Sequence, residues 1–221
     1  VVMQSWIYLH FPTLQLDALF SEQASLPLAI VESKRFKIVQ CNEIARQQGV
    51  QTGMGLGSAS AMCHQLQVHP YDEKVEQHTL LDIAQWLYMV TSDICLLPPQ
   101  GVLLKATNML SLYGGLEPYW QRVSQHLTQL QLNYSYSSGF SPFSAIALGK
   151  ANAALLTLEK EQLIKVIKPF PLTATELDNK TVEKLQRVGI TTLSDLLDIP
   201  IKELARRFDI DLVNYVGKLM G

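Results

Sequence analysis

The chain has 221 residues, of which 48% are hydrophobic and 17% charged, and its formal net charge is −2. This hydrophobic share is typical of packed globular proteins and excludes a disordered chain, while the near-neutral charge gives no general attraction to nucleic acid or membrane. The longest hydrophobic runs, such as Val102–Leu104, are too short to span a bilayer, and the start of the chain lacks the basic region of a signal peptide. We therefore expect a cytoplasmic protein with no membrane contact, in which Cys41, Cys63 and Cys95 are reduced, buried thiols.

The first third of the chain is predicted to form one buried strand followed by a small lobe. The hydrophobic side chains between Val2 and Leu9 predict a buried strand, and Pro12 then begins a helix that Pro27 ends. Asn42 can cap a following helix. Three short strands are expected at 28–31, 38–41 and 66–69, a basic hairpin at 34–37, and two short helices at 43–48 and about 58–65.

The middle of the chain predicts the remaining strands of a sheet. Hydrophobic residues at helical spacing indicate a long helix over about 73–91, and the turn residues 98–101 indicate a hairpin. When residues 12–68 are set aside, the order is strand, helix, strand, strand, helix, strand, which is that of a ferredoxin-like sheet. The other expected elements are strands at 94–97, 102–106 and 134–136, and helices at 117–131 and 145–156.

The chain changes in character after Ile167, where two prolines indicate a linker. Four short amphipathic helices are expected at 180–188, 192–198, 202–208 and 212–219. A glycine turn joins the first two in the manner of a helix-hairpin-helix, whose backbone N–H groups can hold a phosphate. The candidate DNA contacts are Lys184, Arg187, Gly189, Thr191 and Thr192. An ordinary helix cap by Gly189 and Thr192 explains the same residues and stays open.

A ferredoxin-like sheet with an added lobe calls for a search for paired carboxylates at strand ends, because two-metal phosphoryl transfer needs them. The first strand ends at His10 instead, and the hairpin carries Gln100 and Gly101. The nearest acids, Asp17 and Asp93, are expected to be solvated and to lie on other elements. No zinc-ligand spacing and no nucleophile motif occurs. We expect no metal, no cofactor and no catalytic residue.

Several motifs nevertheless resemble a Y-family translesion DNA polymerase of the DinB/UmuC-like kind. They are Cys41–Arg46, Gly53-Met54, Gly139–Pro142 and Leu185–Leu196. The resemblance implies an α+β fold: a ferredoxin-like palm, a small inserted fingers lobe and an all-α helix-hairpin-helix thumb. The palm would comprise 1–11 and 69–165, the fingers 12–68 and the thumb 166–221, with the little finger and the C-terminal tail outside this chain.

The functional positions of that family are replaced here. Its metal-binding acids fall on His10, Gln100 and Gly101, and the aromatic residue that excludes ribonucleotides falls on Gln15. The fingers tyrosine that contacts the triphosphate falls on Glu43. Of the family's nucleotide-binding pair only Arg46 is retained. Two further motifs, Leu9–Pro12 and Leu112–Gly115, resemble the ImuB branch of the family.

The resemblance to this branch implies an inactive polymerase homologue that acts as an adaptor in DNA-damage tolerance and induced mutagenesis. The partners it implies are a sliding clamp, an error-prone replicative-type polymerase and a RecA-like accessory protein, bound mainly through regions beyond Gly221. DNA would be held weakly by this part. Two alternatives stay open: an active Y-family translesion polymerase, and a helix-hairpin-helix DNA-binding protein without enzyme activity.

Overall fold

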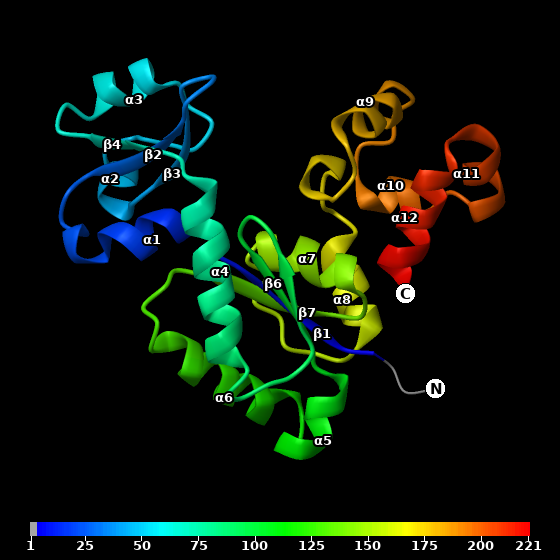
Figure 1. The fold of residues 1–221 in the computed structure, drawn as a ribbon. Helices are drawn as coiled ribbons and strands as arrows, with labels where there is room; N and C mark the ends of the chain where they lie inside the picture. Colours follow the sequence, from blue (N-terminus) through cyan, green and yellow to red (C-terminus); the bar gives the residue numbers. More distant parts are fainter. Residues whose placement is uncertain (1–3) are drawn as a thin grey trace.

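A four-stranded antiparallel sheet, the central sheet, lies in the middle of the molecule (Figure 1). The computed structural model describes residues 4–221, so Val2, which the sequence places in the first strand, lies outside the described residues. The strand order β5-β6-β1-β7 is that of a ferredoxin-like fold, which confirms the prediction. The strands are β1 (Trp6–His10), β5 (Ile94–Leu97), β6 (Gly101–Lys105) and β7 (Ser135–Gly139).

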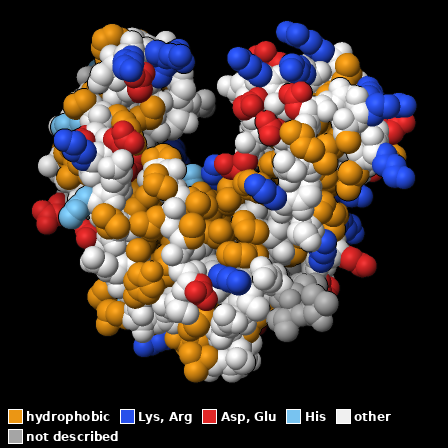
Figure 2. All heavy atoms as spheres, turned by 45° about the vertical axis from the view of Figure 1, so that its right-hand side comes forward, with side chains coloured by type: hydrophobic (Ala, Val, Ile, Leu, Met, Phe, Trp, Pro, Cys, Tyr) orange, Lys and Arg blue, Asp and Glu red, His pale blue; other side chains and the backbone are white. Residues whose placement is uncertain are grey.

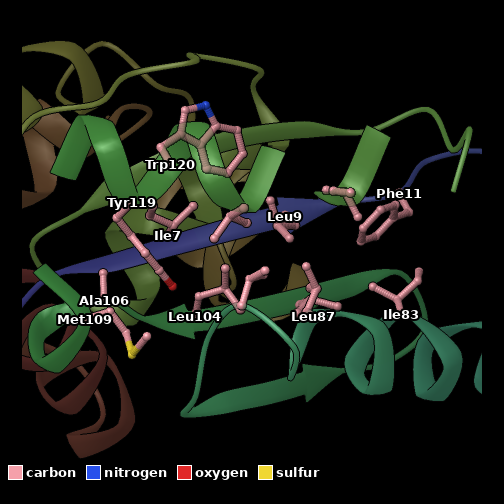
Figure 3. Close-up of a cluster of buried hydrophobic side chains, with 14 of the residues drawn as sticks. Ile7, Leu9, Phe11, Ile83, Leu87, Leu104, Ala106, Met109, Tyr119 and Trp120 are labelled. Carbon is pink, nitrogen blue, oxygen red and sulfur yellow. The ribbon is translucent and has the colours of Figure 1, made fainter. Parts of the chain in front are cut away.

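Two helices, α4 (Glu73–Leu87) and α6 (Leu116–Thr128), cover one face of the central sheet (Figure 1). Alternate residues of β1 face them, so Ile7 and Leu9 are fully buried, and Leu87 of α4 packs against the same cluster (Figure 3). Burial of each such side chain stabilises the fold by roughly 1.5–3 kcal/mol. Near the end of this layer lie the short helices η2 (Thr107–Met109) and α5 (Leu110–Tyr113).

The other face of the central sheet is covered by α7 (Pro142–Lys150), which packs on β7 and β1. Ser141 caps this helix in a capping box, and Pro142 occupies its first turn. The predicted helix 145–156 is wrong at both ends. It stops at Lys150 because Asn152 and Ala154 adopt positive φ values of 53°, and the chain then bonds to the outer edge of β7.

An inserted lobe, residues 12–70, has its own three-stranded sheet of order β3-β2-β4. The predicted strands and the basic hairpin are present, and Cys41 and Cys63 are buried in the lobe as expected. Cys95 was also predicted to be buried, and that prediction is wrong: Cys95 is exposed on β5, an edge strand of the central sheet. The lobe contains α1 (Leu14–Phe20), η1 (Ser21–Gln23), β2 (Leu28–Glu32), β3 (Lys37–Cys41), α2 (Glu43–Gln47), α3 (Leu56–Met62) and β4 (Gln67–Pro70).

The C-terminal helices form a second arm, on the opposite side of the central sheet from the inserted lobe (Figure 1). Their hydrophobic core continues into α7, so this arm packs directly on the sheet layer. Four of them were predicted and a fifth, α8, was not. Among the described residues, no helix is long and hydrophobic enough to cross a membrane. The helices of the C-terminal arm are α8 (Lys160–Ile167), α9 (Asn179–Arg187), α10 (Leu193–Leu197), α11 (Ile201–Arg207) and α12 (Ile210–Met220), with η3 (Leu172–Ala174) between α8 and α9.

Candidate functional site

The end of β1 and the β5–β6 turn meet between the two arms, where the space-filling view shows a deep cleft (Figure 2). His10 lies opposite Gly101 in the sheet, and the Phe11 amide donates to the Gln100 carbonyl at 2.9 Å. The structure therefore brings the three positions singled out in the sequence together. They line a cavity of about 400 Å³ with Tyr8, Leu97, Pro98, Pro99, Phe143, Ile146, Lys150 and Glu176.

The imidazole of His10 is held as a neutral group. Its Nδ1 lies 3.2 Å from the hydroxyl of Tyr8, and the two rings stack with centroids 6.0 Å apart. Burial, with a smaller contribution from the positive charge of Lys150, lowers the pKa of His10 to about 4, although Glu176 acts in the opposite direction. Burial also raises the pKa of Tyr8, so its hydroxyl stays protonated and can donate to His10.

Gly101 has no room for a side chain. A Cβ built on it would lie 2.6 Å from the Tyr8 hydroxyl and 2.9 Å from the Leu97 carbonyl oxygen. The second of these atoms belongs to the backbone and cannot turn away. Any residue larger than glycine at position 101 therefore requires Tyr8 or the β5–β6 turn to move.

The side chain of Gln100 is engaged away from the cavity. Its Nε2 donates to Glu76 of α4, at 3.1 Å to Oε2 and 3.5 Å to Oε1. Glu76 is fully buried. Glu76 was not predicted from the sequence, although it shares the inward spacing of Leu80, Ile83 and Leu87.

The charged groups that line the cavity neutralise each other. Lys150 Nζ of α7 lies 2.8 Å from Glu176 Oε1, which belongs to the segment before α9. This pair joins the sheet layer to the C-terminal arm and was also missed in the sequence. Among residues 4–221 no group of three or more His, Cys, Asp or Glu side chains could hold a metal ion. The arrangement offers one neutral imidazole and one paired carboxylate, which is a poor donor set for Mg²⁺.

The retained Arg46 lies elsewhere. It is exposed on α2 and lines a separate cavity of about 380 Å³ together with Glu43 and Asp17. Asp17 is not simply solvated, as the sequence suggested: it accepts hydrogen bonds from Thr13 and from the backbone and side chain of Asn133. Burial raises its pKa despite these bonds. Asp93 is exposed, as expected.

Gln15 is nearly fully buried and points at the backbone that leads into α4. Its Nε2 donates to the Pro70 carbonyl at 2.9 Å, and its Oε1 accepts from the Asp72 amide at 2.8 Å. Both polar ends of the side chain are thus engaged by the chain itself. The Gln15 side chain is only 2% exposed, so it presents almost no surface to a nucleotide.

The glycine turn between α9 and α10 has the expected conformation, with Gly189 at a φ of 84°. Its N–H groups are not free, because the amides of Thr191 and Thr192 both donate to the Asp195 carboxylate, at 3.1 and 3.2 Å. These bonds lower the pKa of Asp195. A phosphate would have to displace Asp195 from this turn. Lys184 and Arg187 are exposed on α9, and DNA contact by these five residues stays a prediction.

Comparison with known proteins identifies proteins that are similar to this chain. The model of the impB/mucB/samB family matches residues 17–148. The DNA polymerase IV of Yersinia enterocolitica is 26% identical over 191 residues, covering 83% of this chain and 54% of that protein. That of Bacillus anthracis is 27% identical over 176 residues, covering 77% and 43%. The chain thus spans about half the length of the curated relatives it matches.

Solved structures share the fold at lower identity. A post-insertion binary complex of Dbh DNA polymerase superposes with a TM-score of 0.77 at 18% identity, covering 98% of this chain and 66% of that one. DinB from Sulfolobus solfataricus superposes with a TM-score of 0.71 at 16% identity, with the same two coverages. Both arms and the central sheet therefore follow the Y-family polymerase arrangement.

Proposed function

The chain belongs to the impB/mucB/samB family, and from that premise we propose that it is a non-catalytic Y-family polymerase homologue of the ImuB branch. It acts as an adaptor in translesion synthesis during DNA-damage tolerance and induced mutagenesis. One observation carries the proposal. In the cavity at the end of β1, the positions that the family resemblance assigns to the metal-binding acids hold His10, Gln100 and Gly101.

Each replacement removes one anionic ligand that two-metal phosphoryl transfer needs. Anionic oxygens must hold both ions and offset their charge. His10 is uncharged near neutral pH, and Gln100, whose Nε2 is bonded to Glu76, carries a neutral carbonyl oxygen in place of an anionic one. Gly101 has no side chain and no space for one. Restoring a single carboxylate would leave the other two positions without a ligand.

A second candidate function, an active translesion polymerase, is favoured by the similarity to proteins named DNA polymerase IV in Yersinia and Bacillus. That similarity extends over most of this chain but lies at 26–27% identity, and it does not restore the missing acids. The third reading, a helix-hairpin-helix protein with an unrelated first part, does not agree with a fold match covering 98% of the chain.

A primer-extension assay separates the first two candidates. The protein is incubated with a primer–template, all four deoxynucleotides and either Mg²⁺ or Mn²⁺, with an active Y-family polymerase as the positive control. We expect no extension above a preparation from cells that carry the tag alone. Template-dependent extension above that background would overturn the non-catalytic assignment.

DNA binding by this chain is expected to be weak and to decrease steeply as the salt concentration rises. Residues 12–68 carry four basic and four acidic side chains, and residues 166–221 carry eight of each. Few phosphates can therefore be neutralised by either arm, and neutralisation of phosphates supplies most sequence-independent affinity. Fluorescence anisotropy with a labelled primer–template checks this, and nanomolar binding at physiological salt would contradict it.

The adaptor role is tested on the partners that the family resemblance implies. The longest natural form of the protein is immobilised and offered a sliding clamp, an error-prone replicative-type polymerase and a RecA-like accessory protein, one at a time. We expect retention of at least the clamp and the polymerase. If none of the three is retained, the adaptor role is wrong, whatever the extension assay shows.

A further inference from the structure

A buried carboxylate lies where the inserted lobe, α4 and the β5–β6 turn meet. Glu76 Oε2 accepts from Gln40 Nε2 at 3.0 Å and from Gln100 Nε2 at 3.1 Å. Burial raises the pKa of the Tyr71 hydroxyl, and the nearby Glu76 carboxylate raises it further. Gln40 in turn accepts from the Leu16 amide of α1 at 3.3 Å.

The donors to Glu76 come from separate parts of the fold. Gln40 lies on β3 of the inserted lobe and is 1% exposed, while Gln100 lies on the turn between two strands of the central sheet. A buried carboxylate without such donors is strongly unfavourable. Glu76 is therefore satisfied only when the lobe and the sheet hold the relative position seen here.

We propose that Glu76 is a positioning residue that fixes the inserted lobe on the central sheet, and that Gln100 is its required carboxamide partner. A carboxylate at position 100 would face Glu76 at about 3 Å inside the protein, where like charges repel strongly. Only one of the two carboxyl groups can then be ionised. The residue that replaces a metal-binding acid of the family thus acquires a structural role of its own.

This inference stands apart from the proposed function, because it concerns the position of the lobe and is measured without DNA or nucleotide. Its failure leaves the extension assay unchanged. The molecule also supplies an internal comparison, since Asp17 and Asn133 join α1 of the lobe to the loop before β7 through a more exposed pair of hydrogen bonds.

The first experiment exchanges the two groups. Gln100→Glu keeps the side-chain shape and is expected to lower the melting temperature by roughly 5–10 °C, because it removes a donor and adds a charge. The double variant Glu76→Gln/Gln100→Glu restores one acid and one amide and is expected to recover at least about half of that loss. The control Gln85→Glu, at an exposed position of α4, is expected to leave the melting temperature unchanged. Strictly additive losses in the double variant would overturn the pairing.

The second experiment measures the position of the lobe. Spin labels on cysteines introduced at Ser58 in α3 and Gln121 in α6, both exposed, report the distance between lobe and sheet layer, with Cys95→Ser removing the exposed native thiol. Glu76→Ala is expected to broaden the distance distribution at least about twofold, whereas Asp17→Ala leaves its width unchanged. A distribution of unchanged width in folded Glu76→Ala would overturn the proposal.

If Glu76→Ala does not fold, Gln40→Leu gives the same test, because it removes only the lobe side of the tie and leaves Gln100 to satisfy part of Glu76. The same broadening is expected. Width equal to that of the unaltered protein would again overturn the assignment of Glu76 as the residue that fixes the lobe.

Discussion

The two faces of the central sheet differ in what their side chains do. Toward α4 and α6, Ile7 and Leu9 have no exposed area and enter a continuous hydrophobic cluster (Figure 3). Toward α7, Tyr8 and His10 of the same strand border a cavity of about 400 Å³ and bond to each other. Strand alternation places the two sets of side chains on opposite sides of one ribbon.

The two faces therefore differ in how far their residues can change while the fold is kept. On the face toward α4 and α6, buried hydrophobic side chains form one large cluster, where any loss of volume is costly. The α7 face contributes close contacts at Gly101 and Gly149, both beside Tyr8, but its polar positions carry little of the packing. Those positions can therefore change at a smaller cost to the fold.

The largest expected effect tests the hydrophobic face. Leu87→Ala removes a fully buried side chain from α4 and is expected to lower the free energy of unfolding by about 2–5 kcal/mol, because it leaves a cavity in the cluster. Leu81→Ala is the matched control on the same helix, where the side chain is 53% exposed, and should cost about 0.5 kcal/mol. Chemical denaturation measures both, and equal losses would mean that this face does not carry the stability.

The α7 face is tested by adding atoms instead of removing them. Gly101→Ala is expected to cost roughly 1–3 kcal/mol, because the new methyl group would overlap Tyr8 and the Leu97 carbonyl oxygen. Gly57→Ala is the control: a Cβ at Gly57 in α3 has no neighbour within 4 Å, and alanine should be neutral or slightly stabilising there.

A second variant shows whether Tyr8 causes the strain. Tyr8→Leu should cost less in the Gly101→Ala background than in the unaltered protein, since it then also relieves the overlap. Identical costs in both backgrounds would assign the strain to the turn backbone alone.

Sequence patterns predicted most of the fold because the hydrophobic repeats of helices and strands involve residues that are close together in the chain. The inward residues of α4 and the alternation in β1 follow directly from helix and strand geometry, so the sheet order and both arms could be anticipated. The errors arose where tertiary contacts determine the end of a helix or the exposure of a side chain. The helix after Ser141 ends at Lys150 because the following residues pair with β7, and Cys95 is exposed because its strand lies at the edge of the sheet.

The site was predictable only in part. The positions of His10, Gln100 and Gly101 followed from strand ends, and the structure brings them together. Their surroundings could not be read from the sequence, because Glu76 lies on another element and Glu176 on another arm. Pairing between residues far apart in the chain leaves no local sequence pattern. An acid on the inward side of a helix, such as Glu76, is the one sign that a buried partner is needed.

A smaller effect concerns the pH dependence of stability. His10 has a folded-state pKa of about 4, below its ordinary value of about 6.5, so the unfolded chain binds more protons between these values. Stability should therefore fall as the pH drops from about 6.5 towards 4. After allowance for solvent screening at this half-buried site, the contribution is about 1–2 kcal/mol.

His10→Gln removes this contribution and should flatten that part of the stability profile. His78→Gln is the control, since the His78 side chain is 79% exposed on α4. The free energy of unfolding, measured by denaturant at intervals between pH 4 and 7.5, gives both profiles. An unchanged slope in His10→Gln would show that His10 is not held neutral by its surroundings.

The smallest expected effect on stability belongs to the ion pair between the sheet layer and the C-terminal arm. Lys150 and Glu176 lie 2.8 Å apart, but their side chains are 43% and 34% exposed, so Lys150→Met should cost no more than about 1 kcal/mol. The pair has a sharper effect on His10. Because the positive charge of Lys150 lowers the pKa of His10 and Glu176 raises it, Lys150→Met should raise that pKa and Glu176→Gln should lower it further. Titration of the His10 ring protons by NMR measures both shifts, and shifts of the same sign would mean that a movement of the arm, not the two charges, sets the state of His10.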